Sequence, residues 1–149
     1  MILDYHLKLS DAQEITASAA STSYLDTTVA GMAVDDELYL VASVNTAFGS
    51  QNGTATLTIA IQADNDEAFG SATTLYTSPA FTVAALVAGF QAIKIRMPIA
   101  TQAAAGTTAT AERYLRAYYT VGTENFNAGK LDLFLVRSPD ITNLRASGT

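Results

Sequence analysis

The sequence predicts an all-β protein: a jelly roll or β-sandwich of about eight antiparallel strands, with extended N- and C-terminal arms. Two observations carry this prediction. Apolar residues recur at every second position in most segments, which is the period of a half-buried strand. Turn-forming Gly, Asn, Asp and Pro residues interrupt these segments at short intervals. No linker or repeat divides the 149 residues, so we expect one domain spanning residues 1–149.

The chain begins with an apolar segment that we interpret as an N-terminal arm, residues 1–12. Its odd positions from Leu3 onward would share one face, as an added strand requires. Such a strand either contacts a partner or completes this protein's own sheet, and both alternatives stay open. The segment has no long apolar core, so we do not expect a secretory signal. A second arm is expected at residues 138–149. The candidate contact residues in the two arms are Ile2, Leu3, Tyr5, Leu7, Leu9 and Arg145.

Short helical turns are expected at two places only. Residues 10–13 have the Ser-x-x-Gln spacing of a capping box. Residues 83–88 precede Gly89, which suits the end of a helical turn. Strands within residues 17–25 and near residues 28–33 are counted among the eight expected strands.

The middle of the chain alternates most clearly. Residues 38–45 and 55–64 each place apolar side chains on one face and smaller or polar ones on the other. Between them, Asn52 and Gly53 form the strongest hairpin signal of the chain, because this dipeptide tolerates the positive φ of a tight turn. Shorter strands are expected at residues 73–77 and 90–97, and Pro98 ends the latter before a small-residue loop at 98–112.

The last two strands are expected at residues 114–121 and 130–136, joined as a closing hairpin. The first of them mixes arginine with tyrosine, which is also the composition of a single-stranded nucleic-acid platform. The period of two places Tyr114, Arg116 and Tyr118 on one face but Tyr119 on the other. The tyrosines therefore do not form one platform, and a paired strand of the sandwich is the better interpretation.

The charge balance limits the possible partners. The chain has 8 Lys and Arg against 14 Asp and Glu, a formal net charge of -6, which argues against nucleic acid and against anionic membranes. The longest apolar stretch, residues 83–88, is too short to span a bilayer. Only 15% of residues are charged and 49% are hydrophobic, so we expect a surface that contacts other proteins. A homodimer is the expected self-association, because two-fold symmetry is the commonest, and other symmetric oligomers and a monomer stay open as alternatives.

The sequence offers few residues for catalysis. It has no cysteine and a single histidine, His6, so thiolate nucleophiles and nitrogen- or sulfur-ligated zinc sites are excluded. We expect no catalytic residues, no metal and no cofactor, and hence no enzyme. The acidic run at residues 64–67 fails the EF-hand pattern, because its fifth position is Ala68. A calcium site of another kind in a loop, a glycan site and a hydrolase with an unrecognised carboxylate pair stay open as alternatives.

Four segments, taken in order, resemble the phage capsid cement proteins, small jelly-roll decoration proteins of certain short-tailed phages. They are SDAQ at residues 10–13 with the Thr/Ala/Ser stretch after it, DNDEAFGSATTL at 64–75, AALVAG at 84–89 leading to Arg96-Met97-Pro98, and RYLRAYYTVG at 113–122 with FNAGKLDLFLV at 126–136. Together they cover most of the chain. The link at 98–112 and the tail after Val136 are longer than in these proteins.

The resemblance implies a non-enzymatic structural protein of the virion. Such a protein binds the outside of the expanded capsid, bridges neighbouring copies of the major capsid protein, and often forms symmetric oligomers. It would be made in the host cytoplasm and end on the capsid surface. A carbohydrate-binding jelly roll for host-surface recognition is the alternative function. Multivalent attachment to a shell would raise avidity without strong single contacts, which suits a surface with little charge.

Overall fold

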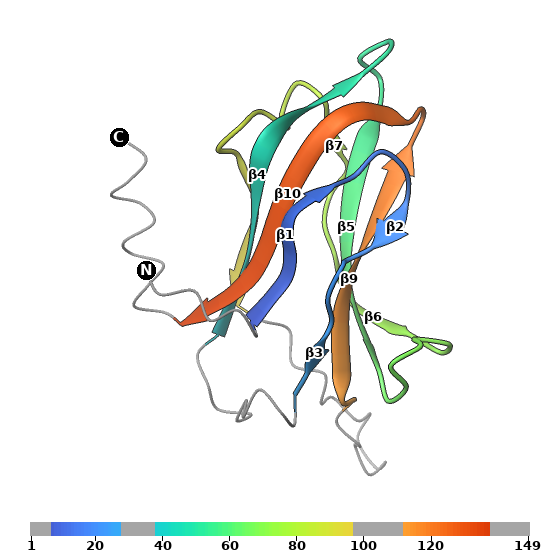
Figure 1. The fold of residues 1–149 in the computed structure, drawn as a ribbon, viewed down its shortest axis with the longest axis vertical. Helices are drawn as coiled ribbons and strands as arrows, with labels where there is room; N and C mark the ends of the chain where they lie inside the picture. Colours follow the sequence, from blue (N-terminus) through green and yellow to red (C-terminus); the bar gives the residue numbers. More distant parts are fainter. Residues whose placement is uncertain (1–6, 28–37, 97–111, 138–149) are drawn as a thin grey trace.

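A computed structural model describes residues 7–27, 38–96 and 112–137. In these ranges the regular structure consists of antiparallel β-strands arranged in two sheets that pack face to face (Figure 1). The all-β sandwich expected from the sequence is confirmed.

The four-stranded sheet has the order β1-β10-β4-β8. The six-stranded sheet has the order β2-β9-β5-β6, with β3 also paired to β9 and β7 also paired to β5. The bounds of the strands in the four-stranded sheet are β1 Lys8–Glu14, β4 Leu38–Ser50, β8 Gln91–Arg96 and β10 Phe126–Arg137. Those of the six-stranded sheet are β2 Ala19–Ala20, β3 Leu25–Asp26, β5 Thr56–Asp64, β6 Thr73–Thr77, β7 Phe81–Thr82 and β9 Tyr114–Gly122.

The topology is that of a jelly roll. Strand β5 pairs with β9 along the full length of both, so β2 and β3 share the other edge of β9. In the same way, β6 and β7 share the other edge of β5. If β2 with β3, and β6 with β7, are each counted as one interrupted strand, the described part of the chain has eight strands, four to a sheet. Their sequence order is then 1-8-3-6 in one sheet and 2-7-4-5 in the other, the double Greek key of a jelly roll.

Two expected hairpins are wrong. Strands β4 and β5 lie in different sheets, and so do β9 and β10. The turn at Asn52 and Gly53 does form, with Gly53 at a φ of 70°, but it carries the chain across the sandwich. Each strand has one apolar face, and crossing to the other sheet lets the two apolar faces meet in the core. Turn chemistry is local and does not reveal this choice.

Of the two expected helical turns, one is wrong and one is confirmed. Residues 10–13 belong to β1, whose register against β10 shifts between Ser10 and Gln13, with Ala12 at a φ of 44°. Residues 83–85 form a helical turn, in which the Leu86 amide bonds to the Thr82 carbonyl at 3.2 Å, and Gly89, at a φ of 85°, lies in a second turn just after it. The strand expected within residues 17–25 appears as β2 and β3, and the one near residues 28–33 lies outside the described residues.

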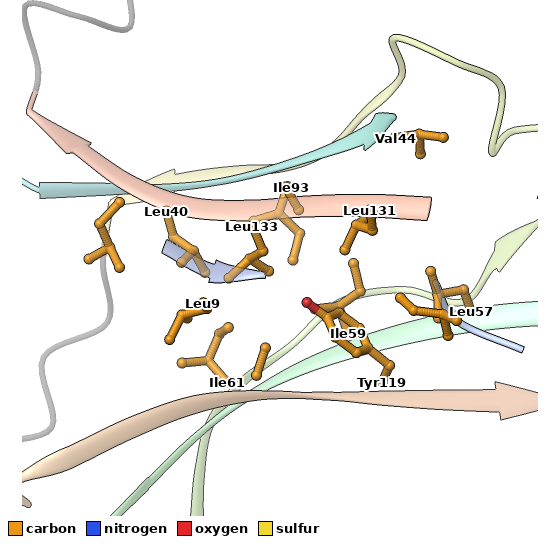
Figure 2. Packing of buried hydrophobic residues seen from close by; sticks show 14 of the residues in the cluster. Leu9, Leu40, Val44, Leu57, Ile59, Ile61, Ile93, Tyr119, Leu131 and Leu133 are labelled. Carbon is orange, nitrogen blue, oxygen red and sulfur yellow. The ribbon is translucent and has the colours of Figure 1, made fainter. Parts of the chain in front are cut away.

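The core fills the space between the sheets, as Figure 2 shows. Alternate side chains of β5 point inward, and Leu57 and Ile59 are both fully buried. Leu131 and Leu133 of β10 enter the core from the opposite sheet and are equally buried, with Leu131 opposite Ile59. The period of two seen in the sequence therefore predicted the buried faces of these strands correctly.

One carboxylate ties together the two loops that cross the sandwich at one end. The side chain of Glu124, which follows β9, accepts hydrogen bonds from the Ser50 hydroxyl at 2.6 Å, the Thr54 amide at 3.0 Å and the Asn52 side-chain amide at 2.9 Å. These donors, first of all the Ser50 hydroxyl, lower the pKa of Glu124 to about 2. The ionised carboxylate is therefore part of the fold at this end.

We expect the stabilisation from Glu124 to depend on pH. A depressed pKa stabilises the fold fully above the ordinary value of 4.5, and this contribution is lost as the pH falls through about 2. The wild type should therefore unfold at a higher urea concentration than Glu124→Gln. This difference in midpoint should be constant above pH 4.5 and should decrease as the pH falls from 4.5 to 2. Glu14→Gln on the exposed side of β1 is the control and should show no such difference. An unchanged difference at low pH would contradict the assignment.

Candidate partner-binding surface

The outer face of the six-stranded sheet carries the arginine and tyrosine side chains of β9. Tyr114, Arg116 and Tyr118 are half-buried on this face, whereas Tyr119 is fully buried in the core. The expectation that the tyrosines divide between two faces is confirmed. Arg116 lies opposite Gln62 of β5 in the sheet register. The neighbouring outward positions of β5 are Thr58 and Ala60 beside Gln62, so this part of the face has little charge.

Two further aromatic rings reach this face from outside β9. The ring of Tyr24, from the segment between β2 and β3, meets the edge of Tyr114 with centroids 5.6 Å apart and that of Phe69 with centroids 6.2 Å apart. Tyr24 is 46% exposed. Its hydroxyl donates to Glu67 at 3.0 Å, and this bond to a carboxylate raises the pKa of Tyr24. Sequence reasoning missed Tyr24 and Phe69, because both lie outside the strands whose alternation places side chains on a face.

The two arginines of this region differ in their partners. Arg113 forms a two-pronged ion pair with Asp26, with Nε to Oδ1 at 3.0 Å and Nη2 to Oδ2 at 2.7 Å, which raises the pKa of Arg113. Arg116 donates from Nε to the side-chain oxygen of Gln62 at 2.9 Å. Its Cζ lies 4.4 Å from the centre of the Phe69 ring and 5.7 Å from that of Tyr118. Aromatic faces therefore hold the guanidinium of Arg116 in place.

The loop after β5 positions Phe69. Asp64 is buried, and its carboxylate accepts the backbone amides of Asp66 at 3.0 Å and Ser71 at 2.9 Å. These amide bonds, that of Asp66 first, lower the pKa of Asp64. Asp66 in turn accepts the amide of Ala68 at 3.0 Å. The acidic run thus folds its own loop, and in the described part of the chain no group of three or more histidine or carboxylate side chains could hold a metal ion.

The expected contact residues of the two arms are only partly described. Leu9 is 1% exposed in the core and Leu7 packs against it, because β1 pairs with β10. This part of the arm therefore completes the protein's own sheet. The others, Ile2, Leu3, Tyr5 and Arg145, lie outside the described residues, and their contact role stays a prediction. No helix in the three described ranges is long and apolar enough to cross a membrane.

A model of the family described as Bbp16 matches residues 9–135, which run from β1 into β10. The chain belongs to the Bbp16 family. Bbp16 is a phage-related family, so the broader part of the resemblance, that of a β-rich phage protein, is confirmed. No curated protein matches the chain.

Proposed function

We propose that this Bbp16-family protein is a capsid cement protein, a structural component of the virion that binds the outer surface of the expanded capsid and bridges neighbouring major capsid subunits. The outer face of the six-stranded sheet is the observation that carries the proposal. It presents Tyr114, Arg116 and Tyr118 beside small and uncharged residues of β5. Tyrosine and arginine are enriched in protein interfaces, and other charged residues are depleted there.

Two carboxylates of the described residues build the fold. The buried carboxylate of Asp64 bonds to its own loop, and Glu124 joins two loops. A net charge of -6 disfavours nucleic acid and anionic lipid as partners. We therefore propose a non-enzymatic protein that needs no cofactor, is made in the host cytoplasm and acts on the capsid surface.

Self-association is part of the proposal. A two-fold dimer uses the same patch on both copies, and the low charge of the chain favours such contacts. Light scattering at micromolar concentration should give about twice the 15.6 kDa of one chain. A mass of one chain at these concentrations would contradict a stable dimer.

Co-sedimentation with phage heads tests the function directly. Purified protein is mixed with the cognate phage's heads stripped of decoration, either expanded or in the compact precursor form. We expect saturable binding to expanded heads only, at a fixed copy number per head. Absence of binding to both forms would overturn the proposal, and saturable binding on a glycan array would then favour a carbohydrate-binding module.

A further inference from the structure

We infer that Arg116 is the anchor of the capsid-binding surface and that it receives a carboxylate, the side chain of an aspartate or glutamate on the partner protein. This inference rests on the proposed function and names the residue and the chemistry by which the surface would recognise its partner.

The hydrogen bonds of Arg116 leave its terminal nitrogens available. The Nε atom is taken by Gln62 at 2.9 Å. Within residues 7–27, 38–96 and 112–137, no acceptor bonds to Nη1 or Nη2 of this side chain. A guanidinium presents its donors in a planar fork that matches the two oxygens of a carboxylate. Arg116 therefore has its donating edge open to a partner.

Aromatic packing fixes the guanidinium before any partner arrives. Its Cζ lies 4.4 Å from the centre of the Phe69 ring and 5.7 Å from that of Tyr118. An arginine that is already held loses little conformational freedom when it binds, so more of the interaction appears as affinity.

Phe69 occupies its place at a conformational cost. Its backbone has a φ of 52°, a conformation that residues other than glycine rarely adopt, and the residue is only 8% exposed. The bond from the Phe69 amide to the Asp66 carbonyl at 3.0 Å and the amides held by Asp64 keep the loop in this shape. Unfavourable backbone conformations concentrate at binding sites, where the surrounding structure enforces them. Here the result is a ring packed against the arginine.

The charges near Arg116 favour a single carboxylate over a nucleic acid. Asp64 is close enough for its pKa to be lowered by Arg116, and the same loop carries Asp66 and Glu67. A chain of phosphates would bring several negative charges close to these carboxylates, whereas one acidic side chain brings a single charge to the fork. The other arginine of the region, Arg113, is already paired with Asp26 and so cannot serve the same purpose.

The test compares two substitutions that remove the same charge three residues apart. Arg116→Gln should weaken binding to undecorated expanded heads about tenfold or more, because the partner carboxylate loses its donors. Arg113→Gln is the matched control and should bind within about threefold of the wild type, because its charge is satisfied inside the protein. Arg116→Lys keeps the charge but not the fork, and should lose most of the affinity. Binding is measured against the concentration of folded protein, taken from a urea unfolding curve of each variant.

Each outcome decides a separate point. If the wild type does not bind heads, the proposed function falls. If the wild type binds and both Arg116 variants bind equally well, the function stands and the inference is overturned. If Arg116→Gln does not fold, Arg116→Lys decides. If the wild type binds single-stranded DNA and Arg116→Gln does not, the ligand of Arg116 is a nucleic acid and not a carboxylate, and the inference is overturned.

Discussion

Replacing Gly129 by alanine is expected to lower the free energy of unfolding by about 3 kcal/mol. Gly129 lies in β10 at a φ of 142°, which other residues rarely adopt. A Cβ atom there would collide with the ring atoms Cδ1 and Cγ of Phe48. The Phe48 ring cannot move away easily, because it is 5% exposed and packs edge-on against Phe126 with centroids 4.9 Å apart. Backbone strain and overpacking therefore add, and urea unfolding measures the sum.

Gly53→Ala separates the two causes. Gly53 also has a positive φ, 70°, but a Cβ atom there would meet no atom within 4 Å. We expect this control to cost about 1 kcal/mol, from backbone strain alone. If the two alanine variants lose equal stability, the contact with Phe48 contributes nothing. In the Phe48→Ala background, Gly129→Ala should cost less than in the wild type, because the ring that it would strike is gone.

The strands could be predicted from the sequence because their side-chain period is local. Leu57, Ile59 and Ile61 alternate with small or polar residues, and burial follows this alternation without exception along the strand interior. The pairing of strands could not be predicted in the same way. The turn at Asn52 and Gly53 has the chemistry of a hairpin, yet the flanking strands enter different sheets. The choice depends on which apolar faces meet in the core, and that is a property of the whole chain.

The sequence predicted only the part of the candidate surface that β9 contributes. The alternation of β9 placed Arg116 and Tyr118 together on the outer face. Phe69 was not foreseen as their neighbour, because its position depends on a loop held by Asp64 and on an uncommon backbone conformation. The SDAQ segment misled in a similar way, since the spacing of Ser10 and Gln13 suits a helix cap. Their side chains do bond, at 2.6 Å, but within a strand.

Ser10 and Tyr119 form a polar link between the two sheets. Ser10 is 1% exposed and Tyr119 is fully buried, and their hydroxyl oxygens are 2.6 Å apart. Ser10 donates its proton to the side-chain oxygen of Gln13, so Tyr119 must be the donor to Ser10. Gln13 in turn donates to the Ala20 carbonyl of β2 at 2.8 Å. These hydrogen bonds thus run from β9 of the six-stranded sheet to β1, at the edge of the four-stranded sheet, and from there back to β2 of the six-stranded sheet.

Because Tyr119 donates to Ser10 and Ser10 donates to Gln13, removing either hydroxyl should have a different effect on stability. Ser10→Ala should lower the free energy of unfolding by about 2 kcal/mol, because the Tyr119 hydroxyl is left buried without an acceptor among the described residues. Tyr119→Phe should cost only about 1 kcal/mol, because Ser10 keeps its bond to Gln13.

The double variant tests the link itself. Ser10→Ala combined with Tyr119→Phe should cost less than the sum of the single changes, because the second change removes the hydroxyl that the first left unpaired. The direction of the bonds is supported by Thr22, whose amide donates to the side-chain oxygen of Gln13 at 2.9 Å. This oxygen is therefore an acceptor, and Ser10 must donate to it. Urea unfolding of the four proteins gives the cycle. Strictly additive costs would show that the two hydroxyls do not depend on each other, and that apolar packing alone joins the sheets at this point.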